Sequence, residues 1–110
     1  MKKNQQDNSV IIYEGDNGKP KLEVRMENET VWLSQAQMVE LFQSSKANVS
    51  EHIKRIFEEG ELDRDSVVRK IRTTAADGKN YKVEHYDLNM IISLGYRIKS
   101  SVATHFRMWA

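Results

Sequence analysis

Short runs of alternating or β-branched residues, separated by turn-forming residues, occupy the beginning of the chain. Residues 10–13 and 30–33 are rich in β-branched and aromatic side chains, and residues 21–26 alternate between polar and apolar. Glycine, asparagine, aspartate and proline cluster over residues 15–20, which is typical of a turn. This pattern predicts an N-terminal β-hairpin and a third strand, preceded by a polar segment over residues 1–9.

The apolar pattern changes to a helical period at Ser34. Ser34 and Gln37 have the spacing of a capping box, and apolar residues follow over residues 38–42. Ser45 can cap a second helix over residues 45–57. The apolar stripe of this second helix consists of Val49, Ile53, Ile56 and Phe57. We therefore predict two short helices joined by a tight turn.

A second hairpin is predicted after an acidic, exposed connector over residues 58–65. Residues 66–73 and 81–86 are β-branched or alternating, and the segment Asp-Gly-Lys-Asn between them is a strong turn signal. Alternation places basic side chains on the outer face of this hairpin, namely Lys70, Arg72 and Lys82. The predicted inner face consists of Val67, Ile71, Tyr81 and Val83.

Two helical segments are predicted at the end of the chain. Asp87 caps the first of them, and the second contains Phe106, Met108 and Trp109. The sequence stops on this apolar turn, so we expect it to be the N-terminal part of a longer protein. An uncovered turn of this kind is expected to fold back or to self-associate, which makes a homodimer one expected assembly. The aromatic residues expected in the core are Trp32, Tyr81, Tyr86, Tyr96 and Trp109.

The order of these elements predicts an α+β fold. Two helices in close succession, followed by a basic hairpin, are typical of a winged helix-turn-helix-like domain. We expect this domain to span residues 10–110, with an N-terminal β-hairpin, a basic β-hairpin wing over residues 67–86 and C-terminal helices. The chain of 110 residues is long enough for one hydrophobic core.

The charges are distributed unevenly along the chain. Residues 1–65 hold 9 Lys+Arg and 13 Asp+Glu, whereas residues 66–110 hold 8 Lys+Arg and 3 Asp+Glu. A basic half of this kind can bind a polyanion, because neutralising phosphates provides most non-specific affinity for nucleic acid. An ordinary solvated surface with uneven charge remains the alternative.

Composition argues against several classes of protein. The chain has no Cys, no secretory signal and no apolar run long enough to span a bilayer, so we expect a cytoplasmic protein without membrane contact. Its three His residues are dispersed, which makes a metal site improbable. We find no P-loop, no dinucleotide-binding glycine motif and no catalytic triad motif, and we predict neither an enzyme nor a cofactor.

The second helix and the basic hairpin supply the candidate DNA-binding residues. Lys can donate to guanine, Asn can pair with adenine and Glu can accept from cytosine. The residues expected at base edges are Lys46, Ala47, Asn48, Ser50, Glu51 and Lys54. The residues expected at phosphates are Ser34, Gln35, Ser45, Arg55, Lys70, Arg72, Lys79 and Lys82. The function predicted from them is DNA binding, by a transcription-regulator-like or targeting module that reads double-stranded DNA with helix 45–57.

The segment from Leu33 to Ile53 resembles the helix-turn-helix pattern of bacterial and phage regulators. Its Leu-Ser-Gln opening, its turn serines and its Asn-Val-Ser-x-His-Ile second helix have the matching spacing. Two residues depart from that pattern. Val39 replaces the usual small residue between the helices, and Gln43 replaces the Gly that is common in the turn.

A wider resemblance covers nearly the whole chain from Val10. The blocks His-Ile-Lys-Arg-Ile-Phe-Glu-Glu-Gly-Glu-Leu, Val-Glu-His-Tyr-Asp-Leu-Asn-Met-Ile-Ile-Ser-Leu-Gly-Tyr-Arg-Ile and Phe-Arg-Met-Trp-Ala resemble the RhuM family of bacterial virulence-associated proteins. The resemblance implies a DNA-binding N-terminal region within a chain about three times as long. Some relatives carry a Fic-type domain, whose His-x-Phe-x-(Asp/Glu)-Gly-Asn-Gly motif does not occur in this sequence.

A second function from another class is compatible with the same fold. The alternative is a protein-interaction or dimerisation module of a virulence- or Fic-associated protein that does not bind DNA. The acidic connector and the apolar turn at Phe106 and Trp109 favour this alternative.

Overall fold

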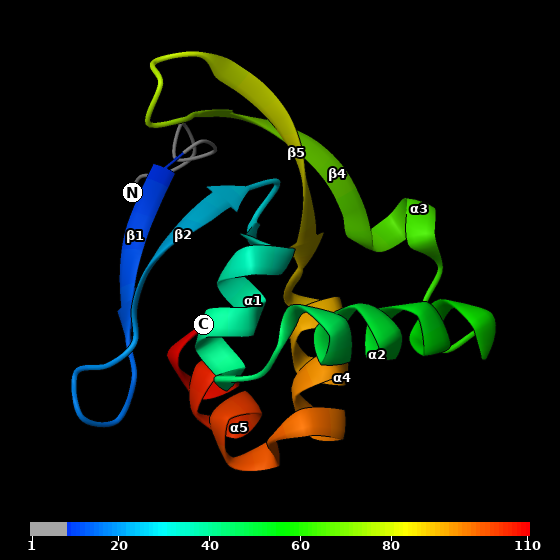
Figure 1. Cartoon of the computed structure of the whole chain (residues 1–110). Helices are drawn as coiled ribbons and strands as arrows, with labels where there is room; N and C mark the ends of the chain where they lie inside the picture. The colour runs from blue at the N-terminus through cyan, green and yellow to red at the C-terminus, as the bar shows by residue number, and fades with distance from the viewer. Residues whose placement is uncertain (1–8) are drawn as a thin grey trace.

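The computed structural model describes residues 9–110, which fold into a mixed α+β structure (Figure 1). In chain order its elements are β1 (Ser9–Glu14), β2 (Lys21–Glu27), β3 (Thr30–Ser34), α1 (Gln35–Phe42), α2 (Lys46–Glu58), α3 (Arg64–Val67), β4 (Val68–Thr74), β5 (Asn80–Asp87), α4 (Leu88–Ile98) and α5 (Ser100–Trp109). The α+β class is therefore confirmed, and so are the two hairpins. The predicted polar segment 1–9 lies outside the described residues, except for Ser9, which begins β1.

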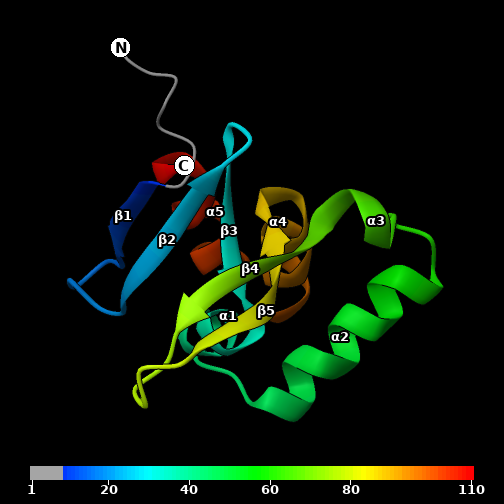
Figure 2. The same cartoon turned by 90° about the horizontal axis from the view of Figure 1, so that it is seen from above.

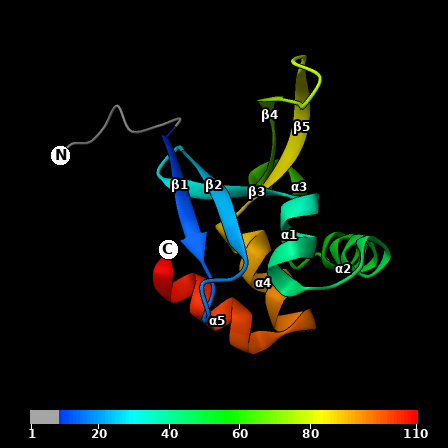
Figure 3. The ribbon, with the colours of Figure 1, turned by 60° about the vertical axis from the view of Figure 1, so that its left-hand side comes forward.

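The strands form one antiparallel sheet in the order β1-β2-β3-β5-β4. β3 pairs only with the last three residues of β5, since Trp32, Leu33 and Ser34 lie opposite Asp87, Tyr86 and His85. The remaining length of the β4–β5 hairpin projects beyond the sheet (Figure 3). A strand pair that extends past its sheet is accessible to a large ligand.

The hydrophobic core lies between the sheet and helices α1, α2, α4 and α5, which gather on one side of it (Figure 1). Fully buried side chains come from each of these helices and from β1, β2 and β3. The largest of them include Tyr13, Leu33, Met38, Phe42, Ile56, Met90, Leu94 and Phe106. The helices α1 and α2 thus pack against α4.

Local sequence signals account for the first two helices. The Ser34 hydroxyl accepts the Gln37 N–H at 3.2 Å, and the Gln37 side-chain oxygen accepts the Ser34 N–H at 2.9 Å, so the capping box is confirmed. In α2 the predicted apolar stripe is confirmed, because Val49, Ile53 and Ile56 are buried.

Gln43 closes α1 in the left-handed conformation, with φ 51° and ψ 48°. Its N–H donates to the Glu40 carbonyl, and the Ser44 N–H donates to the Val39 carbonyl. This is the arrangement in which glycine is usually found, because a side chain makes it unfavourable. The departure noted at Gln43 therefore leaves the tight turn intact at some cost in stability.

The apolar turn at the end of the chain folds back on the domain, which is the first of the two outcomes expected for it. Helix α5 folds back on β1, where the Tyr13 ring lies 4.9 Å from the Phe106 ring and 5.1 Å from the Trp109 ring. Phe106 is fully buried and Trp109 is half-buried, whereas Met108 is 79% exposed. The partner of this turn is a strand at the other end of the sequence, which no local pattern identifies.

Three expectations need correction. Tyr81 and Tyr96 are each 46% exposed and do not belong to the core, because Tyr81 lies beyond the part of the hairpin that meets the helices. Val67 is buried as predicted, but it ends the short helix α3 and is not part of a strand. The connector is only partly free, since Arg97 binds Glu59 at 2.7 Å and Glu61 at 2.8 Å.

Candidate nucleic-acid interface

The outer face of the β4–β5 hairpin carries a row of exposed basic side chains. Lys70, Arg72 and Lys82 are exposed and lie on one face of the hairpin, as predicted. Arg72 is directly opposite Lys82, and Lys70 is opposite Glu84. Like charges in directly opposite positions destabilise a strand pair, so this arrangement costs stability unless an anion lies near it.

Most arginines in the described part of the chain, including Arg69 on β4, have a carboxylate within 4.0 Å. Arg25 and Arg69 approach Glu27, Arg55 binds Glu51, Arg64 binds Glu84 and Arg97 binds two glutamates. Within residues 9–110, the hairpin cations Lys70, Arg72, Lys79 and Lys82 have no carboxylate within 4.0 Å. The charge of these four side chains is therefore not compensated by a neighbouring carboxylate.

The hairpin turn is ordered by Asp77. Its carboxylate accepts the Lys79 N–H at 2.9 Å and the Tyr81 hydroxyl at 2.7 Å. These two hydrogen bonds lower the pKa of Asp77, and the same carboxylate raises the pKa of Tyr81. Lys79 lies at the tip of the hairpin and is exposed. The hydrogen bond from its backbone N–H to Asp77 fixes the position of its backbone.

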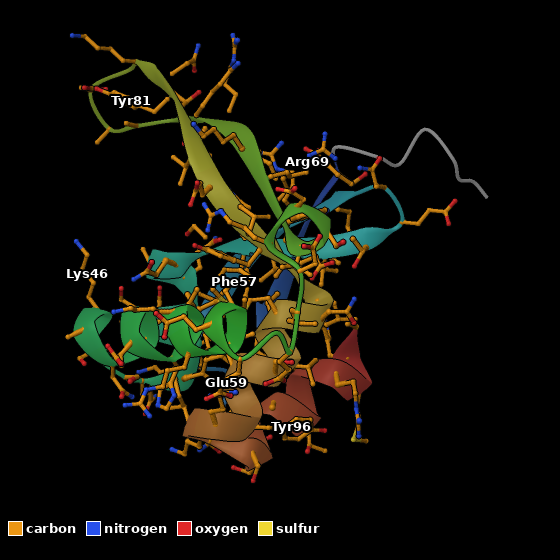
Figure 4. The ribbon with its side chains drawn as sticks, turned by 90° about the vertical axis from the view of Figure 1, so that its right-hand side faces the viewer. Lys46, Phe57, Glu59, Arg69, Tyr81 and Tyr96 are labelled. Carbon is orange, nitrogen blue, oxygen red and sulfur yellow. The ribbon has the colours of Figure 1, made fainter. Side chains whose placement is uncertain are left out.

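The candidate base-reading residues all lie on the solvent side of α2. Lys46, Ala47, Asn48, Ser50, Glu51 and Lys54 are exposed, whereas the opposite side of the helix is buried. Lys46, Ser50 and Lys54 recur every four residues and form one stripe along the helix. Figure 4 shows Lys46 and Phe57 pointing from α2 toward the side on which the hairpin projects, whereas Glu59 points to the opposite side.

Asn48 and Arg55 lie on a different flank of α2. A rotation of about 100° per residue places Asn48 roughly opposite Lys46 around the helix axis. The Asn48 amide donates to the Ser44 hydroxyl at 2.8 Å, and Arg55 binds Glu51 at 3.1 Å. This Arg55 hydrogen bond lowers the pKa of Glu51. The structure thus separates the predicted base-edge residues into two flanks, of which the Lys46 stripe faces the hairpin side.

The N-terminal ends of α1 and α2 lie next to each other. Gln35, Ala36, Val39 and Lys46 line a shallow depression of about 350 Å³ between them. Ser34 and Ser45 are the N-caps, and Ser45 accepts the Asn48 N–H at 3.0 Å. Viewed from above, the tip of the hairpin and the first turn of α2 project from the same side of the molecule (Figure 2).

Arg64 is a positioning residue that sequence reasoning missed. Its guanidinium binds the Glu84 carboxylate at 2.6 Å and lies 5.6 Å from the centre of the Phe57 ring. The residue therefore connects the base of the hairpin to the end of α2. Its signal in the sequence is weak, because it belongs to an acidic connector and its partner is twenty residues away.

A comparison with protein families gives one match, over the later part of the chain. The residues from the end of α3 through α5 include the basic hairpin and the two C-terminal helices. Residues 66–110 match the model of the Virulence protein RhuM family. This match agrees with the resemblance noted in the sequence for the blocks at residues 83–98 and 106–110, and it does not include the block at residues 52–62. The matched segment includes Lys70, Arg72, Lys79 and Lys82, whereas α1 and α2 precede it. No curated protein and no solved structure matches the chain.

In residues 9–110 no helix is both long and apolar enough to cross a bilayer. The same part of the chain contains no group of three His, Cys, Asp or Glu side chains arranged to hold a metal ion.

Proposed function

We propose that this domain binds double-stranded DNA, with α2 in the major groove and the β4–β5 hairpin on the neighbouring backbone. The observation that carries the proposal is the set of hairpin cations without carboxylate partners, on the side toward which Lys46 points. Phosphates along a duplex are spaced regularly and would neutralise such a row.

The topology supports a winged helix-turn-helix assignment. Apart from the short helix α3, the chain order β3-α1-α2-α3-β4-β5 and the strand order β3-β5-β4 are those of a winged domain that lacks its first helix. Helix α4 packs against α1 and α2 and supplies the third helix of the core. The β1–β2 hairpin is an addition at the far edge of the sheet.

Within this proposal the residues have different tasks. Lys46, Ser50 and Lys54 approach base edges, because they lie on the flank of α2 that faces the hairpin side. Lys70, Arg72, Lys79 and Lys82 contact phosphates, together with Gln35 and Ser45 at the helix N-termini. Asn48 and Arg55 lie on the other flank and contribute less.

A salt titration tests the proposal. Replacing Arg72 and Lys82 by Gln should weaken binding to all duplexes and lower the slope of log affinity against log salt by about two. The matched control replaces Lys99 and Arg107 by Gln, since both are exposed cations outside the hairpin and α2. Fluorescence anisotropy with random duplex DNA measures the slope. The proposal fails if the wild-type domain does not bind at low salt, or if both double variants lose the same slope.

The alternative of a protein-interaction module loses one of its supports, because Phe106 and Trp109 pack against Tyr13. A different surface, the edge strand β1, favours contact with another protein chain. That surface is independent of the hairpin cations.

A further inference from the structure

The edge strand β1 exposes three consecutive apolar side chains. Val10 is 49% exposed, Ile11 is 39% exposed and Ile12 is 53% exposed. Strand alternation puts Ile11 on the same face as the buried Tyr13, whereas Val10 and Ile12 are on the other face. Apolar surface is therefore available on both faces of the same strand.

The two edges of the sheet differ in their protection. The other edge strand, β4, carries Arg69, Lys70 and Arg72, and charged side chains are a usual means of preventing edge-to-edge pairing. The middle of β1 contains no charge, no proline and no glycine. An unprotected apolar edge is the surface on which another strand adds to a sheet.

We propose that β1 pairs with β1 of a second copy of this chain, antiparallel and with the two-fold axis at Ile11. A symmetric pair of this kind joins the two sheets into one and is isologous, because each copy contributes the same surface.

Only this register places all three apolar residues of β1 opposite apolar residues of the second copy. With the axis at Ile11, Val10 lies opposite Ile12 of the second copy, and Ile11 lies opposite its counterpart. All the pairs keep their side chains on the same face of the sheet, and all three apolar residues meet apolar residues. An axis at Ile12 would place Val10 opposite Glu14, and an axis at Val10 would place Ile11 opposite Ser9. This self-complementarity argues for a second copy as the occupant.

The pairing is expected to be weak and reversible. Six residues per strand bury less than the roughly 800 Å² per partner of a standard interface. A concentration series from about 10 μM to about 1 mM covers the range in which such a dimer forms.

Sedimentation with charged variants is the first test. Ile11→Lys and Ile12→Lys should each raise the dimer dissociation constant about tenfold or more, because each places a charge in the apolar edge. Ile11→Lys also brings two like charges directly opposite each other at the two-fold axis. The matched control is Met108→Lys, which makes the same change at a 79% exposed position on α5. Circular dichroism establishes whether each variant is folded. If Ile11→Lys unfolds the domain, the test rests on Ile12→Lys, because Ile12 is the more exposed residue. A wild-type monomer over the whole series overturns the proposal.

Disulfide trapping tests the register. The chain contains no Cys, so single cysteine variants report one contact each. Directly opposite residues of an antiparallel pair have Cα atoms about 4.5–5.5 Å apart, which lies within the range of a disulfide. Ile11→Cys should therefore cross-link readily, and Ile12→Cys and Met108→Cys should cross-link more slowly although both positions are more exposed. Cross-linking that follows exposure, and not position on the axis, overturns the proposal.

Discussion

Gly95 of α4 lies against side chains of α1 and α5, and its replacement provides a sensitive test of how these three helices pack. A Cβ at this position of α4 would lie 2.6 Å from the Ala103 Cβ on α5. It would also lie 2.8 Å from two ring carbons of Phe42 on α1. Carbon atoms in contact are normally about 3.5–4.0 Å apart, so one helix must move by roughly 1 Å.

Two opposing terms set the magnitude for Gly95→Ala. Ala is favoured over Gly in a helix by about 1 kcal/mol, whereas overpacking a core costs about 1–3 kcal/mol. The Ala103 Cβ is fixed to its backbone and cannot rotate away, so the cost falls in the upper part of that range. We expect a net loss of about 2 kcal/mol, or a melting temperature lower by roughly 10 °C.

Thermal unfolding followed by circular dichroism measures this loss. Asn89→Ala is the matched control, because Asn89 is an exposed position of the same helix and gains helix propensity without a collision. The double variant Gly95→Ala with Ala103→Gly should recover part of the loss, because it removes the nearer of the colliding atoms. Gly95→Ala that is as stable as Asn89→Ala would refute the close approach of α4 to α5.

Two further predictions concern stability. Gln43→Gly should stabilise the domain by about 1 kcal/mol, because Gln43 is exposed and its backbone is left-handed. Gln43→Ala should change the stability by less than about 0.5 kcal/mol. Urea unfolding measures both variants, and equal effects would contradict the reasoning. Burial lowers the pKa of His85, so the unfolded chain binds a proton before the folded one does as the pH falls. The free energy of unfolding should therefore decrease as the pH falls from about 7 to about 5.5. Urea titrations at several pH values should show that His85→Asn removes much of this decrease. An equal decrease in the variant would show that other groups cause it.

Local patterns were sufficient for the elements that carry the candidate interface. The capping box at Ser34, the stripe through Val49, Ile53 and Ile56, and the outward basic face of the hairpin all depend on residues close together in sequence. Each of these patterns reports the period of one element and which side of it is buried. The separation of Lys46 from Asn48 was also accessible, since it requires only the rotation per residue of a helix.

Contacts between distant residues could not be predicted in this way. The Tyr13 hydroxyl and the His105 Nδ1 atom share a hydrogen bond of 2.5 Å across 92 residues, and the Tyr13 ring packs against Phe106 and Trp109. The apolar end of α5 has the same periodicity whether a strand covers it or solvent does. Arg64 is similar, because a single charged residue in a connector does not indicate that it binds the hairpin.

The two proposals concern opposite edges of one sheet, and this makes them separable by experiment. The cations Arg72 and Lys82 lie on the β4–β5 hairpin, whereas Ile11 lies on β1 at the other end of the strand order. Replacing the cations should therefore leave the dimer constant unchanged, and Ile11→Lys should leave the salt slope per protomer unchanged. If both proposals hold, each dimer presents two copies of α2 related by a two-fold axis. DNA sites selected by the wild-type dimer should then be palindromic, and those selected by Ile11→Lys should be single half-sites. Palindromic sites selected by a protein that is monomeric in every assay would show that the two-fold axis lies elsewhere.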